Sequence, residues 1–130
     1  MLRVTNLRVK KDMKIIIFND ELRSQMQMYL ALHHRYDVEI AEDEETLLQI
    51  LDSNAVDITF VDLNYASGEH NGETGVKLAQ HVREKYPKLR VIGIHDGHDN
   101  KIEDKAQELG LNSIITRPIK NRQLLKVLET

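Results

Sequence analysis

Cysteine is absent from the 130-residue chain. Its absence excludes disulfide bonds and metal sites that are built from thiolates. It is compatible with a reducing compartment, and we expect the protein to be cytoplasmic. The sequence also lacks a signal peptide and any apolar run long enough to span a membrane, so we expect no contact with a membrane.

Several functional motifs are missing as well. The sequence contains neither G-x-G-x-x-G nor G-x-x-x-x-G-K-[ST], which argues against dinucleotide and P-loop nucleotide binding. It has no serine nucleophile elbow. The net charge is −3, so the chain has no overall basic field that would attract nucleic acid.

What is present indicates one globular domain. Apolar residues make up 41% of the chain and charged residues 30%, as in proteins with a single packed core. Residues 1–12 carry four basic side chains and one acidic one, and "KIIIF" then begins a compact segment after Met13. We therefore expect a flexible basic leader over 1–12 and a folded domain over 13–130.

Short apolar runs alternate with helical periodicity along the folded segment, which is typical of βα units around a parallel sheet. The five predicted strands are 14–18, 38–41, 58–61, 90–94 and 113–116. Helices are predicted near 21–33, 43–53 and 74–85, then around Ile102–Leu109 and Leu124–Leu128. In the first helix, Leu22, Met26, Tyr29 and Leu30 fall on one face, as expected of a helix that packs on a core.

Polar residues follow each of four predicted strands. In an open parallel sheet, ligands bind beyond the carboxyl ends of the strands, so these residues define the expected site. They are Asn19 and Asp20, Asp62 and Asn64, His95 and Asp96, and Thr116 and Arg117 followed by Pro118.

Three stretches carry a family resemblance. The segments "IIIFNDE", "DITFVDLN" and "KAQELGLNSIITRPI" resemble the receiver domain of bacterial two-component response regulators, over about residues 13–129. The resemblance implies an α/β fold, a doubly wound five-stranded parallel sheet in a three-layer α/β/α sandwich. The expected arrangement of this sheet is flavodoxin-like, with strand order 2-1-3-4-5.

The resemblance also implies roles for individual residues. Asp62 matches the aspartate that accepts a phosphoryl group from a histidine kinase, and Asp20 matches an acid that binds Mg²⁺ directly. Asp62 itself and the backbone carbonyl of Asn64 would complete the metal ligands, with Asn19 holding a metal-bound water. Hard oxygen ligands of this kind suit Mg²⁺.

The sequence departs from the family pattern at this site. Asn19 replaces the first acid of the pair, which lowers the negative charge and weakens Mg²⁺ binding. His95 replaces a threonine or serine and Arg117 replaces a lysine, so these two residues are the predicted phosphate-binding pair. Ile114 lies where many relatives carry an aromatic residue.

The loop after Asp62 also departs from the pattern, because it is about five residues longer than usual. Within "YASGEHNGETG" we expect Gly75, rather than Gly72, to open the third helix.

Alternative interpretations of the same residues remain open at this point. Asp62 could cap the following turn, Asp20 could cap the first helix, and Arg117 could form a salt bridge to Asp62 in a site that needs no phosphate. A second interpretation, a transition-metal site from His70, His95 and His98, lacks further soft ligands, and solvated loop histidines explain the pattern better.

The functional prediction is a phosphorelay receiver that is not itself an enzyme. Its expected partners are a histidine kinase or phosphotransfer protein, and a downstream protein that contacts the face formed by helix four, strand five and helix five. The alternative is a pseudo-receiver, a protein-interaction module that works without phosphorylation and in which Arg117 and His95 hold one conformation. A small Mg²⁺-dependent phosphotransfer enzyme is a third, weaker hypothesis.

Overall fold

The structure is a computed structural model, and it describes residues 13–65, 74–97, 100–111 and 113–129. The predicted leader over 1–12, most of the long loop after Asp62, and His98 lie outside these residues. Within the described ranges, no helix is both long and apolar enough to cross a membrane.

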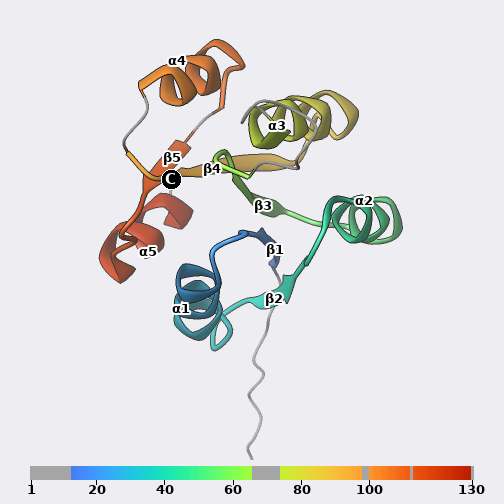
Figure 1. Cartoon of the computed structure of the whole chain (residues 1–130). Helices are drawn as coiled ribbons and strands as arrows, with labels where there is room; N and C mark the ends of the chain where they lie inside the picture. Colours follow the sequence, from blue (N-terminus) through green and yellow to red (C-terminus); the bar gives the residue numbers. More distant parts are fainter. Residues whose placement is uncertain (1–12, 66–73, 98–99, 112, 130) are drawn as a thin grey trace, which may run out of the picture.

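Over the residues that the structure describes, five strands and five helices alternate (Figure 1). The strands are β1 (Lys14–Phe18), β2 (Asp37–Ile40), β3 (Ile58–Asp62), β4 (Arg90–His95) and β5 (Ser113–Thr116). The helices are α1 (Leu22–Leu32), α2 (Glu44–Ser53), α3 (Thr74–Lys85), α4 (Asn100–Glu108) and α5 (Asn121–Glu129). All strand pairs are parallel and the order is β2-β1-β3-β4-β5, so the predicted fold class and strand order are confirmed.

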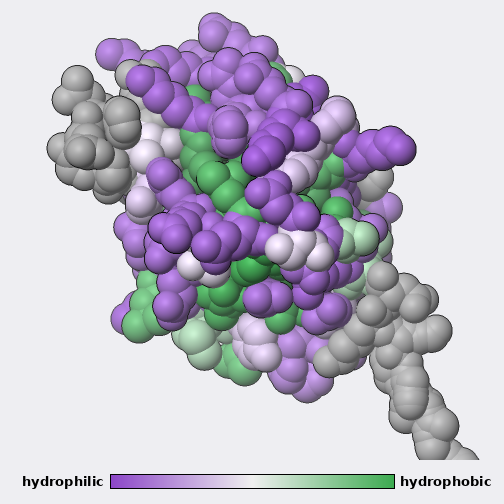
Figure 2. Space-filling view, turned by 90° about the vertical axis from the view of Figure 1, so that its right-hand side faces the viewer, coloured by the Kyte–Doolittle hydropathy of each residue, from purple (hydrophilic) through white to green (hydrophobic). Residues whose placement is uncertain are grey.

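Two apolar clusters fill the two sides of the sheet. Side chains from α2, α3 and α4 form one cluster, whereas α1 and α5 contribute to the other. Figure 1 shows the same division, with α1 and α5 on one side of the sheet and α2, α3 and α4 on the other. Hydrophilic residues cover most of the outer face along α2 and α3, with narrower apolar areas between them (Figure 2).

The central strands β1, β3 and β4 are almost completely buried. Strands buried on both faces read as continuous apolar runs, which is why "KIIIF" and "ITFV" were recognisable in the sequence. Asp62 is the last residue of β3, and its neighbours in the sheet place it beside the ends of β1 and β4. The topology therefore brings the polar strand ends together at one edge.

Gly75 lies in the first turn of α3, as predicted. A Cβ atom added at this position would lie 2.2 Å from the backbone oxygen of Asp62. Any side chain here would displace α3 from the end of β3, so the glycine is needed for close approach.

The predicted core-facing side of α1 is wrong for three of its four residues, and only Tyr29 packs against the core. Leu22, Met26 and Leu30 are exposed, by 69%, 43% and 58%, whereas the buried residues are Ser24, Met28 and Leu32. The helix carries apolar residues around much of its circumference, so periodicity alone does not fix which side faces the core. Ser24 faces inward because it accepts a hydrogen bond from the buried side-chain amide of Asn19 at 2.7 Å. A polar contact thus sets the rotation of the helix.

Two methionines on this helix provide a matched test of that rotation. Met28 is fully buried, so we expect Met28→Ala to lower the free energy of unfolding by about 2–4 kcal/mol. Met26 is 43% exposed, so Met26→Ala should cost less than about 0.5 kcal/mol. Denaturant titration of the two variants measures both values, and equal losses would contradict the described orientation of α1.

Candidate functional site

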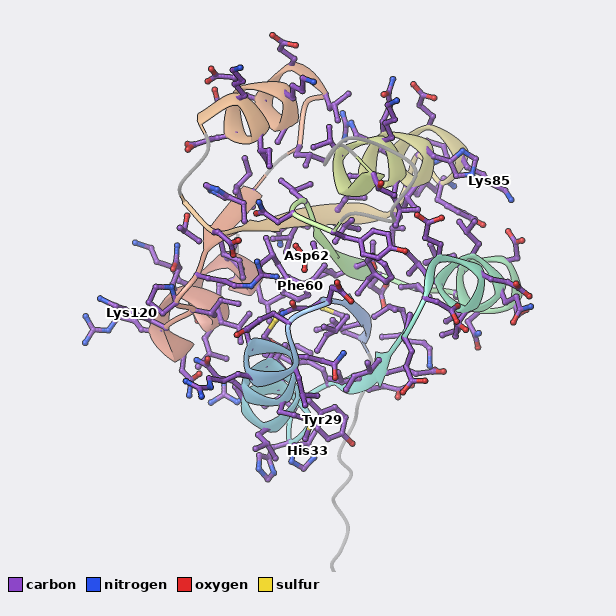
Figure 3. All side chains as sticks on the ribbon, in the orientation of Figure 1. Tyr29, His33, Phe60, Asp62, Lys85 and Lys120 are labelled. Carbon is purple, nitrogen blue, oxygen red and sulfur yellow. The ribbon has the colours of Figure 1, made fainter. Side chains whose placement is uncertain are left out.

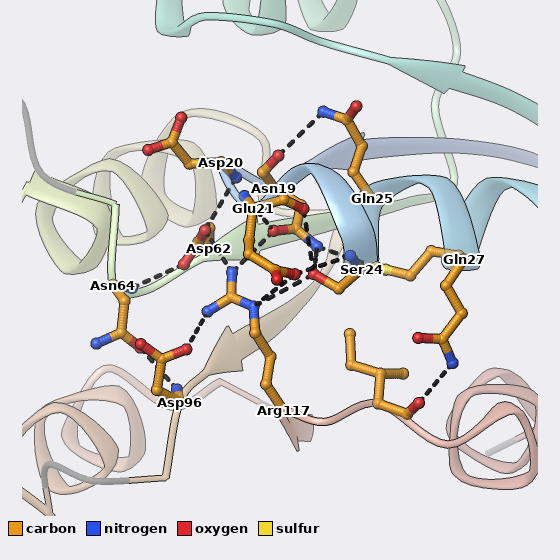
Figure 4. Close-up of polar contacts among 12 residues, drawn as sticks. Asn19, Asp20, Glu21, Ser24, Gln25, Gln27, Asp62, Asn64, Asp96 and Arg117 are labelled. Atoms are coloured by element: carbon orange, nitrogen blue, oxygen red, sulfur yellow. Dashed lines mark hydrogen bonds and ion pairs between the residues drawn. The ribbon is translucent and has the colours of Figure 1, made fainter.

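Arg117 is the centre of the polar cluster at the sheet edge. Its Nη2 donates to Oδ2 of Asp62 at 2.5 Å, and its Nη1 donates to Oδ1 of Asp96 at 2.5 Å. Nη2 also donates to Oδ1 of Asn19 at 2.8 Å, and Nε donates to the hydroxyl of Ser24 at 3.3 Å. Figure 4 shows the guanidinium group between the ends of β1, β3 and β4.

Asp62 is deeply enclosed by these contacts. Its side chain is only 3% exposed, and Figure 3 places it near the middle of the molecule. Oδ2 accepts from the backbone N–H of Asp20 at 2.9 Å as well as from Arg117, and Oδ1 accepts from the backbone N–H of Asn64 at 2.9 Å. The cost of burying the carboxylate is therefore offset by one cation and two backbone donors.

The electrostatics of Arg117 are dominated by its two acidic partners. Burial alone would lower the pKa of the guanidinium group, but the charge of Asp62 and the hydrogen bonds to Asp96 and Asp62 outweigh it and raise the pKa. Arg117 thus remains charged at any physiological pH, and its side chain is only 11% exposed. The site has a permanent internal cation.

Asp96 lies in the cluster, as expected of a polar residue that follows a strand, but its contact with Arg117 was not predicted, and Ser24 was not predicted as a site residue at all. The backbone N–H of Asp96 donates to the side-chain oxygen of Asn64 at 2.8 Å, so Asn64 holds the carboxylate beside Arg117. The contact could have been inferred from an acidic and a basic residue that follow two strands at the same edge of the sheet. Ser24 gave no such signal, because a serine within an apolar helix pattern has no sequence context that points to a site.

Two alternative roles were open for the acidic residues, a turn cap for Asp62 and a helix cap for Asp20, and only the first is found. Asp62 does accept from the turn that follows it, through Asn64. The N-cap of α1 is not Asp20 but Glu21, whose carboxylate accepts from the backbone N–H of Ser24 at 2.8 Å. Hydrogen bonds from Ser24 accordingly lower the pKa of Glu21. The side chain of Asp20 is left exposed beside the site.

His95 lies at the end of β4 but its ring contacts a different set of residues. Its Nδ1 accepts from the backbone N–H of Gly97 at 3.1 Å, so the proton of the neutral ring is on Nε2. Nε2 lies 3.1 Å from the hydroxyl of Thr116 and 4.0 Å from the carboxylate of Glu103. The buried ring therefore joins β4 to β5 and α4, and its predicted contact with a phosphoryl group stays a prediction.

The predicted metal ligands are mostly engaged in other contacts, which leaves few oxygens for Mg²⁺. Both oxygens of Asp62 accept N–H groups, and the side-chain oxygen of Asn19 accepts from Arg117 and from the backbone N–H of Glu21 at 3.0 Å. Only Asp20 offers a carboxylate that none of these donors occupies. A guanidinium group in contact with Asp62 would also repel a divalent cation. The residues as arranged do not fit Mg²⁺.

The acidic and histidine residues outside this cluster give no stronger candidate. Within the described ranges, no group of three or more His, Asp or Glu side chains is arranged to hold a metal ion. His70 and His98, two of the three histidines of the alternative metal site, lie outside those ranges.

Comparisons with known proteins agree with this fold. Residues 10–129 match the family described as the response regulator receiver domain. The chain therefore belongs to the receiver-domain family of two-component response regulators. A search of curated protein sequences finds no match.

Solved structures show the same architecture. A CheY-like receiver domain protein from Methanospirillum hungatei JF-1 is 19% identical, with 90% of each chain covered and a TM-score of 0.77. A response regulator from Thermotoga maritima is also 19% identical, over 90% of this chain and 94% of that one, with a TM-score of 0.78. The BeF3-activated receiver domain of DrrB, a Thermotoga maritima protein, is 20% identical over 90% and 94% of the two chains, with a TM-score of 0.74. At these identities the likeness establishes the fold.

Removal of the Arg117 charge tests how much the cluster depends on it. Arg117→Met keeps an unbranched chain but leaves the carboxylate of Asp62 buried without a cation, so we expect a loss of about 3 kcal/mol in the free energy of unfolding. Adding Asp62→Asn to this variant should restore part of the loss, because it removes the uncompensated charge. Chemical denaturation of the two single variants and the double variant gives the coupling free energy.

An exposed ion pair of the same molecule is the matched control. Lys85 lies 3.4 Å from Asp52, and both side chains are about half exposed. Lys85→Met should have a much smaller effect than Arg117→Met, since solvent screens such pairs. Equal effects of the two substitutions would show that Arg117 is no more than a surface charge.

Proposed function

We propose that this receiver domain is a pseudo-receiver, a protein-interaction module of two-component signalling whose conformation is set without phosphorylation. The observation that carries the proposal is the 2.5 Å contact between Nη2 of Arg117 and Oδ2 of Asp62. Membership of the receiver-domain family supports a role in two-component signalling. The proposal adds that the conformation of this chain does not depend on phosphorylation of Asp62.

The chemistry of phosphoryl transfer supports the proposal. A carboxylate that attacks phosphorus needs an oxygen that the phosphodonor can approach, and the charge that develops on the phosphoryl oxygens needs stabilisation. Oδ2 of Asp62 is covered by two donors and the side chain is only 3% exposed. Transfer would therefore require Arg117 to leave Asp62 first. This step has a cost, because the arginine is anchored separately by Asp96 and Ser24.

The contacts of His95 also support a fixed conformation, on the side of the site that faces β5 and α4. The ring bonds to Thr116, the residue directly before Arg117, and approaches Glu103 on α4. It thereby links β4, β5 and α4 without any contribution from a phosphoryl group. We place the output surface on the α4–β5–α5 face, where this link would hold the elements in one arrangement.

The second candidate function is a phosphorylation switch, with Asp62 accepting a phosphoryl group from a histidine kinase with Mg²⁺. One observation favours it, namely that the backbone N–H of Asp20, a residue whose carboxylate is exposed, donates to Oδ2 of Asp62 at 2.9 Å. In this function Arg117 would move from Asp62 to the phosphoryl oxygens, and His95 would turn towards them. Mg²⁺ would be held by Asp20, Asp62 and the carbonyl of Asn64, with Asn19 acting through water.

A ligand-induced thermal shift separates the two functions. With millimolar Mg²⁺ and beryllofluoride, we expect no change in the melting temperature of the wild-type protein, because Arg117 already neutralises Asp62. The DrrB receiver domain, solved in a BeF3-activated form, is the positive control for the reagent. An increase in melting temperature that disappears in Asp62→Asn would contradict the pseudo-receiver and support the switch.

A further inference from the structure

The sheet has an open edge at β2. Among the described residues, this strand pairs only with β1 and is the outermost strand on its side of the sheet (Figure 1). The backbone N–H of Ala41, the residue after β2, donates to the carbonyl oxygen of Ile17 on β1 at 2.9 Å. Because backbone groups alternate in direction along a strand, the N–H and C=O groups of Val38 and Ile40 point away from the sheet. They can therefore pair with one further strand.

The side chains of β2 alternate between apolar and acidic. Val38 and Ile40 pack against the apolar cluster of α1 and α5, whereas Asp37 and Glu39 are about half exposed on the opposite face. Lys14 lies 3.4 Å from Asp37 and 3.2 Å from Glu39, so one ammonium group is shared by two carboxylates. A strand that pairs with this edge must therefore have an apolar side and a basic side.

The charges that flank β2 leave this edge acidic overall. One cation, Arg35, precedes the strand, and two acids, Glu42 and Asp43, follow it, all of them exposed. Together with the two acids of β2 and the lysine that they share, the edge has four acidic and two basic groups. A second copy of β2 would not fit here. Residues that lie opposite each other share a face, so every register places acids against acids or acids against apolar residues.

We propose that residues 3–8 of the basic leader pair with β2 of the same chain, as an antiparallel sixth strand that covers this edge. The segment reads "RVTNLR", with a cation at each end, the β-branched Val4 and Thr5, and neither glycine nor proline. It belongs to residues 1–12, which lie outside the described ranges. This goes beyond the proposed function, because it concerns the edge of the sheet and does not depend on whether Asp62 is phosphorylated.

The length of chain before β1 selects the register. Met13 is held in place, because its carbonyl oxygen accepts from the N–H of Asp37 at 3.0 Å. An outer strand beside β2 lies two strand spacings, about 10 Å, from β1, and the chain must pass around the end of β2 between them. From Arg8 to Met13 the chain reaches about 17 Å, which is enough if Arg8 lies opposite Asp37. From Lys10 it reaches only about 10 Å, which leaves nothing for the detour.

This register also matches the side chains of β2. Arg8 lies opposite Asp37 and diagonal to Glu39, so it supplies a second cation to the two acids that share one lysine. Leu7 lies opposite Val38, on the apolar face of the strand. A shift by one residue would exchange the two faces and lose both matches. The other opposite pairs set no like charges together, and they are Asn6 with Glu39, Thr5 with Ile40, Val4 with Ala41 and Arg3 with Glu42.

Hydrogen exchange of single amides, followed by NMR in the full chain, tests the pairing. The N–H groups of Val38 and Ile40 face away from β1, so we expect them to be protected at least about tenfold only if a further strand binds them. Arg8→Glu should remove this protection and leave that of Ala41, which bonds to β1, unchanged. Lys11→Glu makes the same change of charge outside the paired segment and is the matched control. Unprotected Val38 and Ile40 in the wild-type protein, or equal losses in the two variants, overturn the proposal.

Pairs of cysteines test the register, since the chain contains none of its own. In the proposed register Asn6 lies opposite Glu39, with Cα atoms about 4.5–5.5 Å apart, which is within the range of a disulfide bond. The full chain with Asn6→Cys and Glu39→Cys should therefore form an intramolecular disulfide under mild oxidation at low protein concentration. It should do so much faster than the chain with Asn6→Cys and Lys77→Cys, whose second cysteine lies on the exposed side of α3. Equal rates, or a disulfide that links two chains, would contradict pairing within one chain.

Discussion

The ion pair between Arg117 and Asp62 determines how the rest of the site is arranged. A carboxylate at the end of a buried strand needs compensation, and in this chain Arg117, the residue that directly follows β5, supplies it at 2.5 Å. The same guanidinium group binds Asn19 after β1, Asp96 after β4 and Ser24 on α1. One side chain therefore ties the ends of three strands and the first helix together.

This ion pair also explains features that are otherwise separate. Ser24 faces the core, where its hydroxyl group accepts hydrogen bonds from Asn19 and Arg117. In this orientation of α1, Leu22, Met26 and Leu30 point outward. Asp96 shares the guanidinium charge and is held in place by Asn64. Arg117 thus contacts both the polar site and the buried side of α1.

Much of this was accessible from the sequence. Continuous apolar runs identified the central strands because those strands are buried on both faces, and the polar residues after each strand located the site. The possibility of an Arg117–Asp62 salt bridge followed from the two residue types, and the structure contains it. Whether Mg²⁺ or a phosphoryl group ever displaces Arg117 stays a prediction, since it depends on competing ligands rather than on the fold.

Other features depended on tertiary contacts that periodicity does not encode. The rotation of α1 is set by a buried serine, and the pattern of leucines and methionines indicated the wrong face. Asp20 was an alternative candidate for the N-cap of α1, whereas Glu21, which directly precedes the helix, accepts from the N–H of Ser24. The ring of His95 turns to Thr116 and Glu103, which no local pattern could show.

The most direct measurement of the central claim is the NMR spectrum of the Arg117 guanidinium group in protein labelled with ¹⁵N. If Arg117 is the permanent counter-ion of Asp62, its Nη signals should be resolved from one another, because rotation is restrained, and they should not move when millimolar Mg²⁺ is added. Signals that are averaged in the free protein, or that shift as Mg²⁺ displaces the arginine, would contradict the account.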